Sequence, residues 1–124
     1  MDTDNLHFHD GSGLSARNLI SSHSMARFLA GLVDEASMEE LLYYLPKGGV
    51  EGTVSWMFKG TSALGKIWLK SGSMENIQSY SGYIQSKSGK WYGFSVIANG
   101  FSAKPKIFRN ELQYLILEIF SQLP

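Results

Sequence analysis

The residues best suited to chemistry form one short run, Lys70-Ser71-Gly72, directly after three apolar residues. Ile67, Trp68 and Leu69 are of the β-branched, aromatic and aliphatic types that favour strands, so we expect Lys70 near the end of a strand. A rigid strand can aim a lysine for catalysis. The run would then present a charged amine, a hydroxyl and a bare backbone at the margin of a sheet, as part of a pocket.

The same tripeptide occurs twice, as Lys70-Ser71-Gly72 and as Lys87-Ser88-Gly89. The second copy lies within residues 85–90, a polar run between two apolar segments, which is typical of a hairpin turn. We therefore predict a turn at the second copy and assign the chemistry to Lys70.

Three predicted strands must position that run. Segments 79–85 and 90–99 are rich in Tyr, Ile, Val and Phe and are joined by residues 86–89, which predicts an antiparallel hairpin. The strand at 66–70 can pair beside it. Three sequential antiparallel strands result.

Helices are predicted before and after these strands. Hydroxyl N-caps at 21–24 precede a helix that ends near Asp34, and a second helix runs from about Ser37 and closes before Pro46, with a core face of leucines. Segment 107–123 is a strong helix with one apolar stripe, which consists of Phe108, Leu112, Leu115, Ile116, Ile119, Phe120 and Leu123. The fold class is therefore α+β, an antiparallel sheet of about three strands with N-terminal helices and a long C-terminal helix.

The segment between the second helix and the first strand is harder to assign. Residues 47–53 carry three glycines and predict a loop with positive-φ positions, whereas 54–59 fit either a helical turn or a short strand. We expect Trp56 and its two neighbours to fill the core. The apolar surface of so small a sheet predicts a part of a larger sandwich, which could also associate with a second copy of the chain.

Composition bounds the class of protein. The chain of 124 residues is 44% hydrophobic and 13% aromatic, the size and character of one globular domain. Eleven basic and eleven acidic residues cancel, which disfavours nucleic acid as a partner, and the lack of cysteine excludes disulfides and thiolate metal sites. No apolar run is long enough to span a membrane. The first five residues are polar and acidic, unlike a secretory signal, so either the protein stays inside or its export signal lies on sequence not present here.

Two histidines near the start invite a metal interpretation. His7 and His9 would share one side of a strand, with Asp10 beside them, but no further ligand cluster follows, so we expect neither metal nor cofactor. The Gly-Ser-Gly run at 11–13 predicts a tight loop, in which Asp10 and Ser12 are structural residues.

Five separated motifs follow one another along the chain: Asp10-Gly11-Ser12-Gly13-Leu14-Ser15, Leu45-Pro46 through Gly49-Val50-Glu51-Gly52-Thr53, Lys70-Ser71-Gly72-Ser73, Ser81-Gly82-Tyr83-Ile84, and Phe94-Ser95-Val96-Ile97-Ala98-Asn99. Their order and approximate spacing resemble the D-alanyl-D-alanine carboxypeptidases. The likeness is greatest to the low-molecular-mass penicillin-binding proteins that combine carboxypeptidase and endopeptidase activity. It spans roughly residues 8–123.

This resemblance implies a serine transpeptidase and β-lactamase type of fold and a role for each residue of the third motif. Lys70 would supply positive charge near the terminal carboxylate of the substrate and tune proton transfer at a neighbouring hydroxyl. Ser71, in place of the more usual threonine, would donate its hydroxyl to that carboxylate. Gly72 would let substrate lie against the strand edge, the N–H of Ser73 would be one of two oxyanion donors, and Met74 would line the pocket for the substrate's side chain.

Two further motifs carry the chemistry of the family: Ser-x-x-Lys, which holds the nucleophile and its base, and Ser-x-Asn. Neither motif occurs in this sequence. The resemblance thus implies that residues 1–124 are the C-terminal part of a transpeptidase-like domain, inactive alone. The parent would be a serine-type carboxypeptidase of the periplasm or cell envelope, with its signal peptide outside this chain. It would cleave peptidoglycan stem peptides through an acyl-serine intermediate and bind β-lactams, and the missing N-terminal part of the same protein would be a partner of this chain.

A second hypothesis is a free-standing, non-catalytic module that binds D-Ala-terminated peptides at the Lys70 strand. The solvent exposure of Trp56, Trp68 and the apolar face of the hairpin discriminates between the incomplete enzyme and the binding module. Surfaces that are bare or covered only by a second copy favour the incomplete enzyme, and surfaces covered within one chain favour the module.

Overall fold

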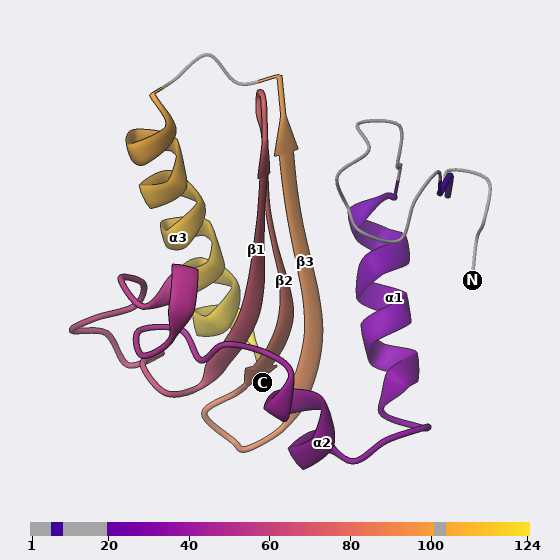
Figure 1. The fold of residues 1–124 in the computed structure, drawn as a ribbon. Helices are drawn as coiled ribbons and strands as arrows, with labels where there is room; N and C mark the ends of the chain where they lie inside the picture. The colour runs from indigo at the N-terminus through magenta and orange to yellow at the C-terminus, as the bar shows by residue number, and fades with distance from the viewer. Residues whose placement is uncertain (1–5, 9–19, 101–103) are drawn as a thin grey trace.

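The computed structural model describes residues 6–8, 20–100 and 104–124, which form three layers (Figure 1). A three-stranded antiparallel sheet lies in the middle, α3 (Pro105–Gln122) covers one face, and α1 (Ser22–Leu32) covers the other. The predicted α+β class is confirmed.

The sheet consists of β1 (Ile67–Met74), β2 (Ile77–Gln85) and β3 (Trp91–Asn99), paired in sequence order. Its registers set Ile67 opposite Ile84 and Trp91 opposite Gln85. The two antiparallel connections were predicted. As a result β1 is an edge strand within the described residues, with β2 on one side only.

The first strand is longer than predicted, because it continues beyond Lys70 to Met74. Residues 71–74 have little intrinsic preference for strands, but each pairs with a residue of β2, from Tyr80 back to Ile77. These cross-strand bonds override local propensity. Lys70 therefore lies in the middle of a strand, which corrects its expected place near the end.

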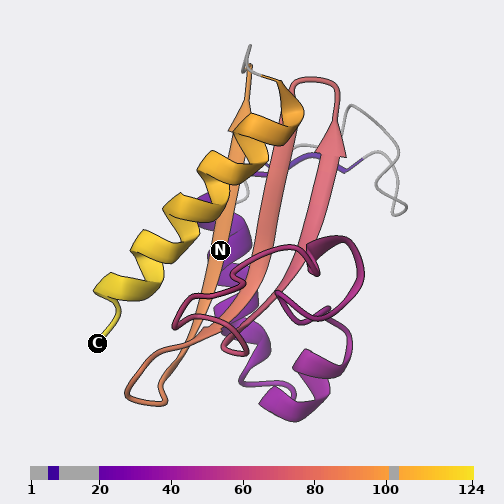
Figure 2. The ribbon, with the colours of Figure 1, turned by 90° about the vertical axis from the view of Figure 1, so that its left-hand side faces the viewer.

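Helix α3 runs obliquely across one face of the sheet (Figure 2). Its buried residues Leu112, Ile116 and Phe120 join side chains of all three strands in a single apolar cluster. Burying side chains of this size is worth about 1.5–3 kcal/mol each, so this interface holds the sheet flat against the helix. The predicted stripe is confirmed except for Leu115, which is 47% exposed.

Helix α1 packs on the opposite face, mainly over β3. It approaches Gly93 so closely that a Cβ there would lie 3.2 Å from the Cβ of Leu29. The hydroxyl of buried Tyr83, on β2, donates to the carbonyl of Leu29 at 2.6 Å, and burial raises the pKa of this phenol. Ser21 caps the helix by accepting from the N–H of Ser24, as its sequence predicted.

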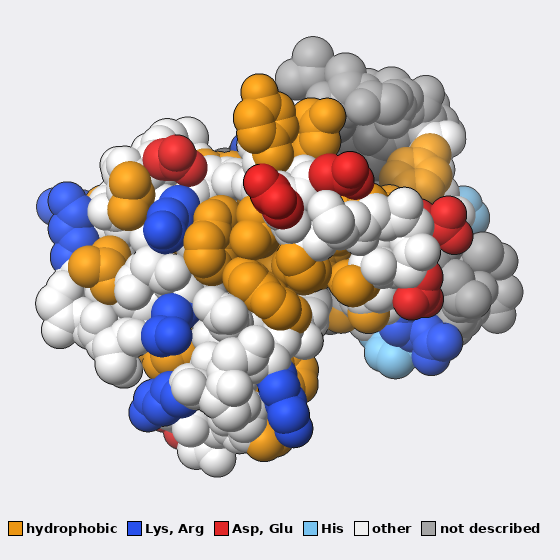
Figure 3. Space-filling view, turned by 90° about the horizontal axis from the view of Figure 1, so that it is seen from below, with side chains coloured by type: hydrophobic (Ala, Val, Ile, Leu, Met, Phe, Trp, Pro, Cys, Tyr) orange, Lys and Arg blue, Asp and Glu red, His pale blue; other side chains and the backbone are white. Residues whose placement is uncertain are grey.

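Helix α2 (Met38–Tyr43) follows, capped by Ser37 as predicted. The three leucines expected on its core face, Leu41, Leu42 and Leu45, are only half-buried. Tyr43 and Tyr44 at its end are 84% and 80% exposed and stack edge to face. Viewed from below, hydrophobic side chains gather near the middle of the visible face, acidic side chains lie mainly above and to the right of them, and most of the visible lysine and arginine side chains lie to the left and below (Figure 3).

The segment between α2 and β1 holds a short 3-10 helix, η1 (Gly52–Val54), and then a series of turns. Met57 and Phe58 are fully buried, as expected for core residues. Trp56 is 38% exposed, which corrects its predicted burial. The backbone N–H of Phe58, a residue with φ of 64°, donates to Gln113 Oε1 at 2.6 Å and ties this segment to α3.

Both faces of the hairpin are therefore covered by helices of the same chain. Trp68 is half-buried, 5.5 Å from the Trp91 ring and below the amine of Lys47 at 5.1 Å. None of the described helices has the length and apolar character needed to cross a lipid bilayer.

Candidate functional site

The outer edge of β1 is one of the two edges at which the sheet, among the described residues, offers unpaired backbone, and it carries Lys70. Its beginning is closed, because Gly48 donates to the carbonyl of Ile67 at 2.9 Å and Leu69 donates to the carbonyl of Pro46 at 3.0 Å. Among the described residues, the backbone–backbone hydrogen bonds to this outer edge all come from this loop, and they stop at Leu69.

The alternation of an antiparallel strand fixes which groups face outward beyond that point. Ile67 and Leu69 turn their backbone groups away from β2, so Ser71 and Ser73 do the same. An extended peptide could therefore pair with Ser71 and Ser73 as an added strand. Neither α1 nor α3 lies over this edge (Figures 1 and 2).

Lys70 is exposed, and its amine donates to the carbonyl of Ser71 at 2.6 Å. The strand register places the Lys70 side chain on the α1 face of the sheet, opposite Ser81. The amine nevertheless reaches the outer edge, because the carbonyl that it contacts faces outward. A single cation thus stands at the outer edge, hydrogen-bonded to one of the backbone groups that no described strand pairs with.

Ser71 points to the opposite face of the sheet, the one covered by α3. Its hydroxyl oxygen lies 2.6 Å from Thr53 Oγ1, a hydrogen bond in which either group can donate. Thr53 belongs to η1, so the loop that closes the start of the edge also fixes this hydroxyl. The sequence analysis included Thr53 in a motif but gave it no role, since a contact over 18 positions leaves no periodic signal.

Gly72, Ser73 and Met74 complete the predicted set. A Cβ at Gly72 would lie 2.6 Å from Ser79 Oγ, which gives this glycine a structural reason besides room for a substrate. The Ser73 hydroxyl donates to Gln78 Oε1 at 2.6 Å. Met74, 42% exposed, ends the strand before the turn at Asn76, whose φ is 58°.

The structure thus brings the five predicted residues together on one strand but divides their side chains between two faces. Lys70, Gly72 and Met74 belong to the α1 face, whereas the two serines belong to the α3 face. His9, Asp10 and Ser12 lie outside the described residues. No cluster of three or more His, Cys, Asp or Glu side chains suited to a metal occurs among the residues that are described.

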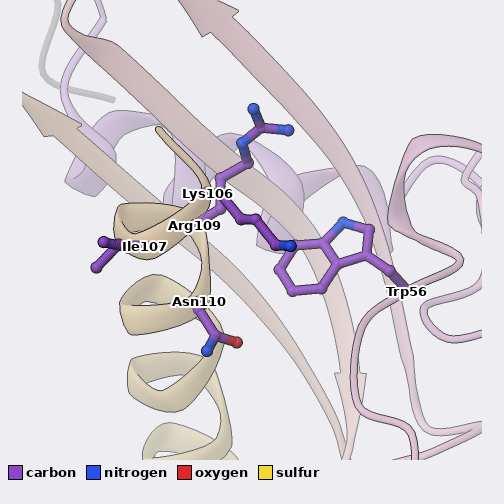
Figure 4. Close-up of a pocket in the computed structure, with 5 residues that line it drawn as sticks. All are labelled: Trp56, Lys106, Ile107, Arg109 and Asn110. Atoms are coloured by element: carbon purple, nitrogen blue, oxygen red, sulfur yellow. The ribbon is translucent and has the colours of Figure 1, made fainter. Parts of the chain in front are cut away.

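A groove lies on the α3 face, between Trp56 and the first turns of α3. It has a volume of about 540 Å³ and is lined by Trp56, Lys106, Ile107, Arg109 and Asn110 (Figure 4). Buried Tyr80 belongs to the same face, where burial raises the pKa of its phenol and the nearby charge of Arg109 opposes that rise. The sequence analysis missed this groove, because its two walls are some fifty positions apart.

Comparison with protein families gives one clear result. A model of the D-Ala-D-Ala carboxypeptidase 3 (S13) family matches residues 1–115. The D-alanyl-D-alanine carboxypeptidase of Actinomadura sp. (strain R39) is 32% identical over 107 residues, which cover 82% of this chain and 20% of that protein. The penicillin-sensitive carboxypeptidase A of Dictyostelium discoideum is 31% identical over 102 residues, again 20% of its length. The chain spans about a fifth of the curated relatives that it matches.

Solved structures show the same fold. The crystal structure of penicillin-binding protein 4 (DacB) from Haemophilus influenzae superposes with a TM-score of 0.80 at 24% identity, and the match covers 94% of this chain and 28% of that one. A structure of the same protein complexed with a novel β-lactam gives a TM-score of 0.77 at 23% identity, over 90% and 28% of the two chains. At these identities the likeness establishes the fold alone.

Proposed function

The chain belongs to the D-Ala-D-Ala carboxypeptidase 3 (S13) family, and from that premise we propose that it supplies one wall of a serine carboxypeptidase site. The substrate is a peptidoglycan stem peptide that ends in D-Ala-D-Ala, and the enzyme acts in the periplasm or cell envelope. The observation that carries the proposal is the open edge of β1, where Lys70-Ser71-Gly72 stands beside outward-facing backbone groups.

The residues of that edge have different roles in substrate binding and catalysis. Substrate adds to the sheet along Ser71 and Ser73, which positions the scissile carbonyl by main-chain hydrogen bonds. The N–H of Ser73 stabilises the oxyanion of the tetrahedral intermediate, and the amine of Lys70 supplies charge and assists proton transfer at the nucleophile. Ser71 donates to the terminal carboxylate, Gly72 leaves the strand edge accessible, and Met74 lines the pocket for the substrate side chain.

The nucleophile comes from elsewhere in the polypeptide. The sequence has no serine followed three positions later by lysine, and it corresponds to about a fifth of the length of its curated relatives. Residues 1–124 therefore act as the C-terminal part of a larger domain, with the rest of the same protein as their partner, and form no acyl-enzyme alone. The complete enzyme also binds β-lactams, which acylate the same serine.

Fluorescent penicillin tests this division directly. The 124-residue chain and a complete polypeptide that contains it are each incubated with the label, denatured and examined for covalent fluorescence and for the mass of the adduct. We expect a stoichiometric adduct on the complete polypeptide, at a serine outside this chain, and none on the chain alone. A stoichiometric adduct on the isolated chain would show that the nucleophile lies within it.

The second candidate function is a non-catalytic module that binds D-Ala-terminated peptides. One observation favours it: α1 and α3 cover both faces of the sheet within one chain, and Trp68 is half-buried. A module of this kind binds N-acetyl-D-alanyl-D-alanine without cleaving it and needs no further polypeptide. The partly exposed Trp56 favours the incomplete enzyme instead.

A further inference from the structure

Side chains hold the part of the β1 edge that the loop leaves unpaired. Within the described part of the chain, no backbone–backbone hydrogen bond reaches the outward groups of Ser71 and Ser73. Ser71 Oγ lies 2.6 Å from Thr53 Oγ1, at the loop. Ser73 Oγ donates to Gln78 Oε1 at 2.6 Å, so Ser73 is tied to β2 and not to the loop.

Gln78 is the residue of β2 directly opposite Ser73. Because the backbone groups of Ser73 face away from β2, the two residues form a non-hydrogen-bonded pair, in which the Cα atoms approach to about 4.5 Å and the side chains lie closest together. The backbone of Ser73 therefore makes no ladder bond with Gln78. The hydrogen bond between the two side chains is the direct link within this pair.

The acceptor in this hydrogen bond is buried and the donor is exposed. Gln78 is 4% exposed, and a buried amide is costly unless it is hydrogen-bonded. On its other side the register sets Ala98 of β3, which has no polar side-chain atom. Ser73 is exposed, so its hydroxyl can bond to water and does not itself need this partner. The buried glutamine thus fixes the position of the acceptor, and the serine is the residue that it immobilises.

The stability of the fold does not by itself require a glutamine at position 78. Gln78 belongs to the same face of the sheet as Tyr80, the face that α3 covers, where apolar side chains form the core. An apolar side chain of similar size would fill the position, and replacement of both members of a hydrogen-bonded pair by apolar groups can be nearly neutral for stability. A need to hold Ser73 in place accounts for the glutamine.

We propose that Gln78 is a positioning residue of the site, which fixes the direction of the Ser73 N–H through the Ser73 hydroxyl. The inference rests on the proposed function, in which that N–H stabilises the oxyanion, and it adds a residue of β2 that touches neither substrate nor nucleophile. An oxyanion donor is effective when it is held in advance about 3 Å from the developing charge. Because this charge forms in the transition state, a loose donor lowers the rate and leaves ground-state binding intact.

The kinetics of the complete polypeptide test this role. Gln78→Met keeps the length of the side chain and replaces the amide by a weak acceptor. We expect it to slow penicillin acylation, and to lower kcat for N-acetyl-D-alanyl-D-alanine, about tenfold with KM nearly unchanged. The affinity for a boronic acid that adds to the nucleophile as a tetrahedral adduct should fall by the same factor. An unchanged rate and boronate affinity, or a raised KM with kcat unchanged, would overturn the proposal.

The exposed partner provides a second set of variants that keep the buried glutamine. Ser73→Ala removes the same hydrogen bond and leaves the backbone N–H in place, and Ser73→Thr keeps a hydroxyl. Ser73→Ala should cause the same loss as Gln78→Met, the double variant should lose no more, and Ser73→Thr should retain the rate. A much larger loss for Ser73→Ala, or losses that add, would show that the hydroxyl acts on the substrate directly and would refute the positioning role.

Ser95→Ala is the matched control for a general effect on the sheet. Its hydroxyl oxygen lies 2.8 Å from Ser81 Oγ, so the substitution removes a side-chain hydrogen bond between β2 and β3, away from the edge. It should lower stability to urea and leave the acylation rate unchanged. Equal slowing by Ser95→Ala and Gln78→Met would reduce Gln78 to a contributor to the stability of the sheet.

The positioning role and the proposed function can fail separately. Stoichiometric penicillin labelling of the complete polypeptide, at a rate that Gln78→Met does not change, would remove the positioning role and leave the carboxypeptidase function intact. Absence of labelling on the complete polypeptide would remove the function and any catalytic role of Gln78 with it.

Discussion

The chain contains the tripeptide Lys-Ser-Gly twice, and the two copies have opposite relations to their own backbone. Lys70-Ser71-Gly72 lies in the extended edge strand β1, paired with β2 on one side. Lys87-Ser88-Gly89 forms the turn between β2 and β3, where Gly89 has φ of +89°. Composition is identical, so the difference comes entirely from the flanking residues.

The turn satisfies its own hydrogen bonds. Ser86 donates to the carbonyl of Lys90 at 2.8 Å, and Gly89 donates to the carbonyl of Ser86 at 2.9 Å. Ser88 Oγ donates to the carbonyl of Pro124 at 2.9 Å. In the edge copy no other described strand pairs with the outward backbone groups of Ser71 and Ser73, and the carbonyl of Ser71 accepts only from the exposed amine of Lys70, at 2.6 Å. A tripeptide is a candidate site where backbone donors and acceptors remain without a neighbouring strand. The groups of the turn at Lys87-Ser88-Gly89 are bonded within the chain.

The largest expected difference between the copies concerns acylation. In the complete polypeptide, Lys70→Ala should slow the rate of penicillin acylation by about 100-fold or more, because it removes a positioned charge that assists proton transfer. Lys87→Ala should leave the rate unchanged. Stopped labelling reactions with fluorescent penicillin measure both rates, and circular dichroism confirms that both variants fold. Equal losses from the two substitutions would refute the assignment of the chemistry to β1.

The next largest effects are expected for substitutions of Gly89 and Gly72, and the measured quantity is the free energy of unfolding. Gly89→Ala should cost about 1–2 kcal/mol, because alanine is strained at positive φ, and Gly89→Asn should recover part of that loss. Gly72→Ala should cost about 1 kcal/mol for a different reason, since its Cβ would lie 2.6 Å from Ser79 Oγ.

The two causes can be separated by a second substitution. Adding Ser79→Ala should rescue Gly72→Ala and should have no effect on Gly89→Ala, as measured by urea unfolding. A failure of the rescue would mean that Gly72 is required for its backbone conformation and not for the space above Ser79.

Much of this contrast could be predicted from the sequence. The polar run around Lys87 predicted the turn, the aromatic and β-branched segments predicted the hairpin, and the hydroxyl caps predicted where α1 and α2 begin. These signals are local, because turn chemistry, side-chain alternation and capping act over a few residues. The family resemblance, based on separated motifs, was confirmed as well.

The parts that could not be predicted depend on partners distant in sequence. The end of β1 was placed too early, because residues 71–74 owe their extended form to pairing with β2. Trp56 was expected in the core, but its neighbours Met57 and Phe58 occupy that space and leave it as a wall of the groove. The bond between Thr53 and Ser71 and the approach of Arg109 to Tyr80 likewise join residues that no periodic pattern connects.

Substitutions of the two serines, Ser71 and Ser88, should have a smaller effect than those of the glycines, and the measured quantity is the rate of acylation. Ser71→Ala in the complete polypeptide should slow penicillin acylation about fivefold, because one neutral hydrogen bond to the carboxylate is worth roughly 1 kcal/mol. Thr53→Val should give part of that loss by freeing the Ser71 hydroxyl, and it should add nothing to Ser71→Ala. Ser88→Ala is the control, because its hydroxyl bonds to Pro124 O and should not affect the rate. Additive losses at Thr53 and Ser71 would show that the two hydroxyls act independently.

The smallest predicted effect is on stability, and here Lys87 should matter and Lys70 should not, the opposite of their effects on acylation. The amine of Lys87 lies 5.8 Å from the centre of the buried Phe120 ring, so Lys87→Ala should lower the free energy of unfolding by about 0.5 kcal/mol. The amine of Lys70 makes only one exposed hydrogen bond, to the carbonyl of Ser71, so Lys70→Ala should leave stability within the error of a urea titration. Lys87→Met, which keeps an apolar stem over the ring without the charge, tells a cation–π contribution from simple packing.

If the turn stabilises the fold and the edge binds a substrate, substitution of Lys87 should change stability and leave the acylation rate unchanged. Substitution of Lys70 should change the acylation rate and leave stability unchanged. A clear loss of stability from Lys70→Ala would instead make the edge lysine a structural residue.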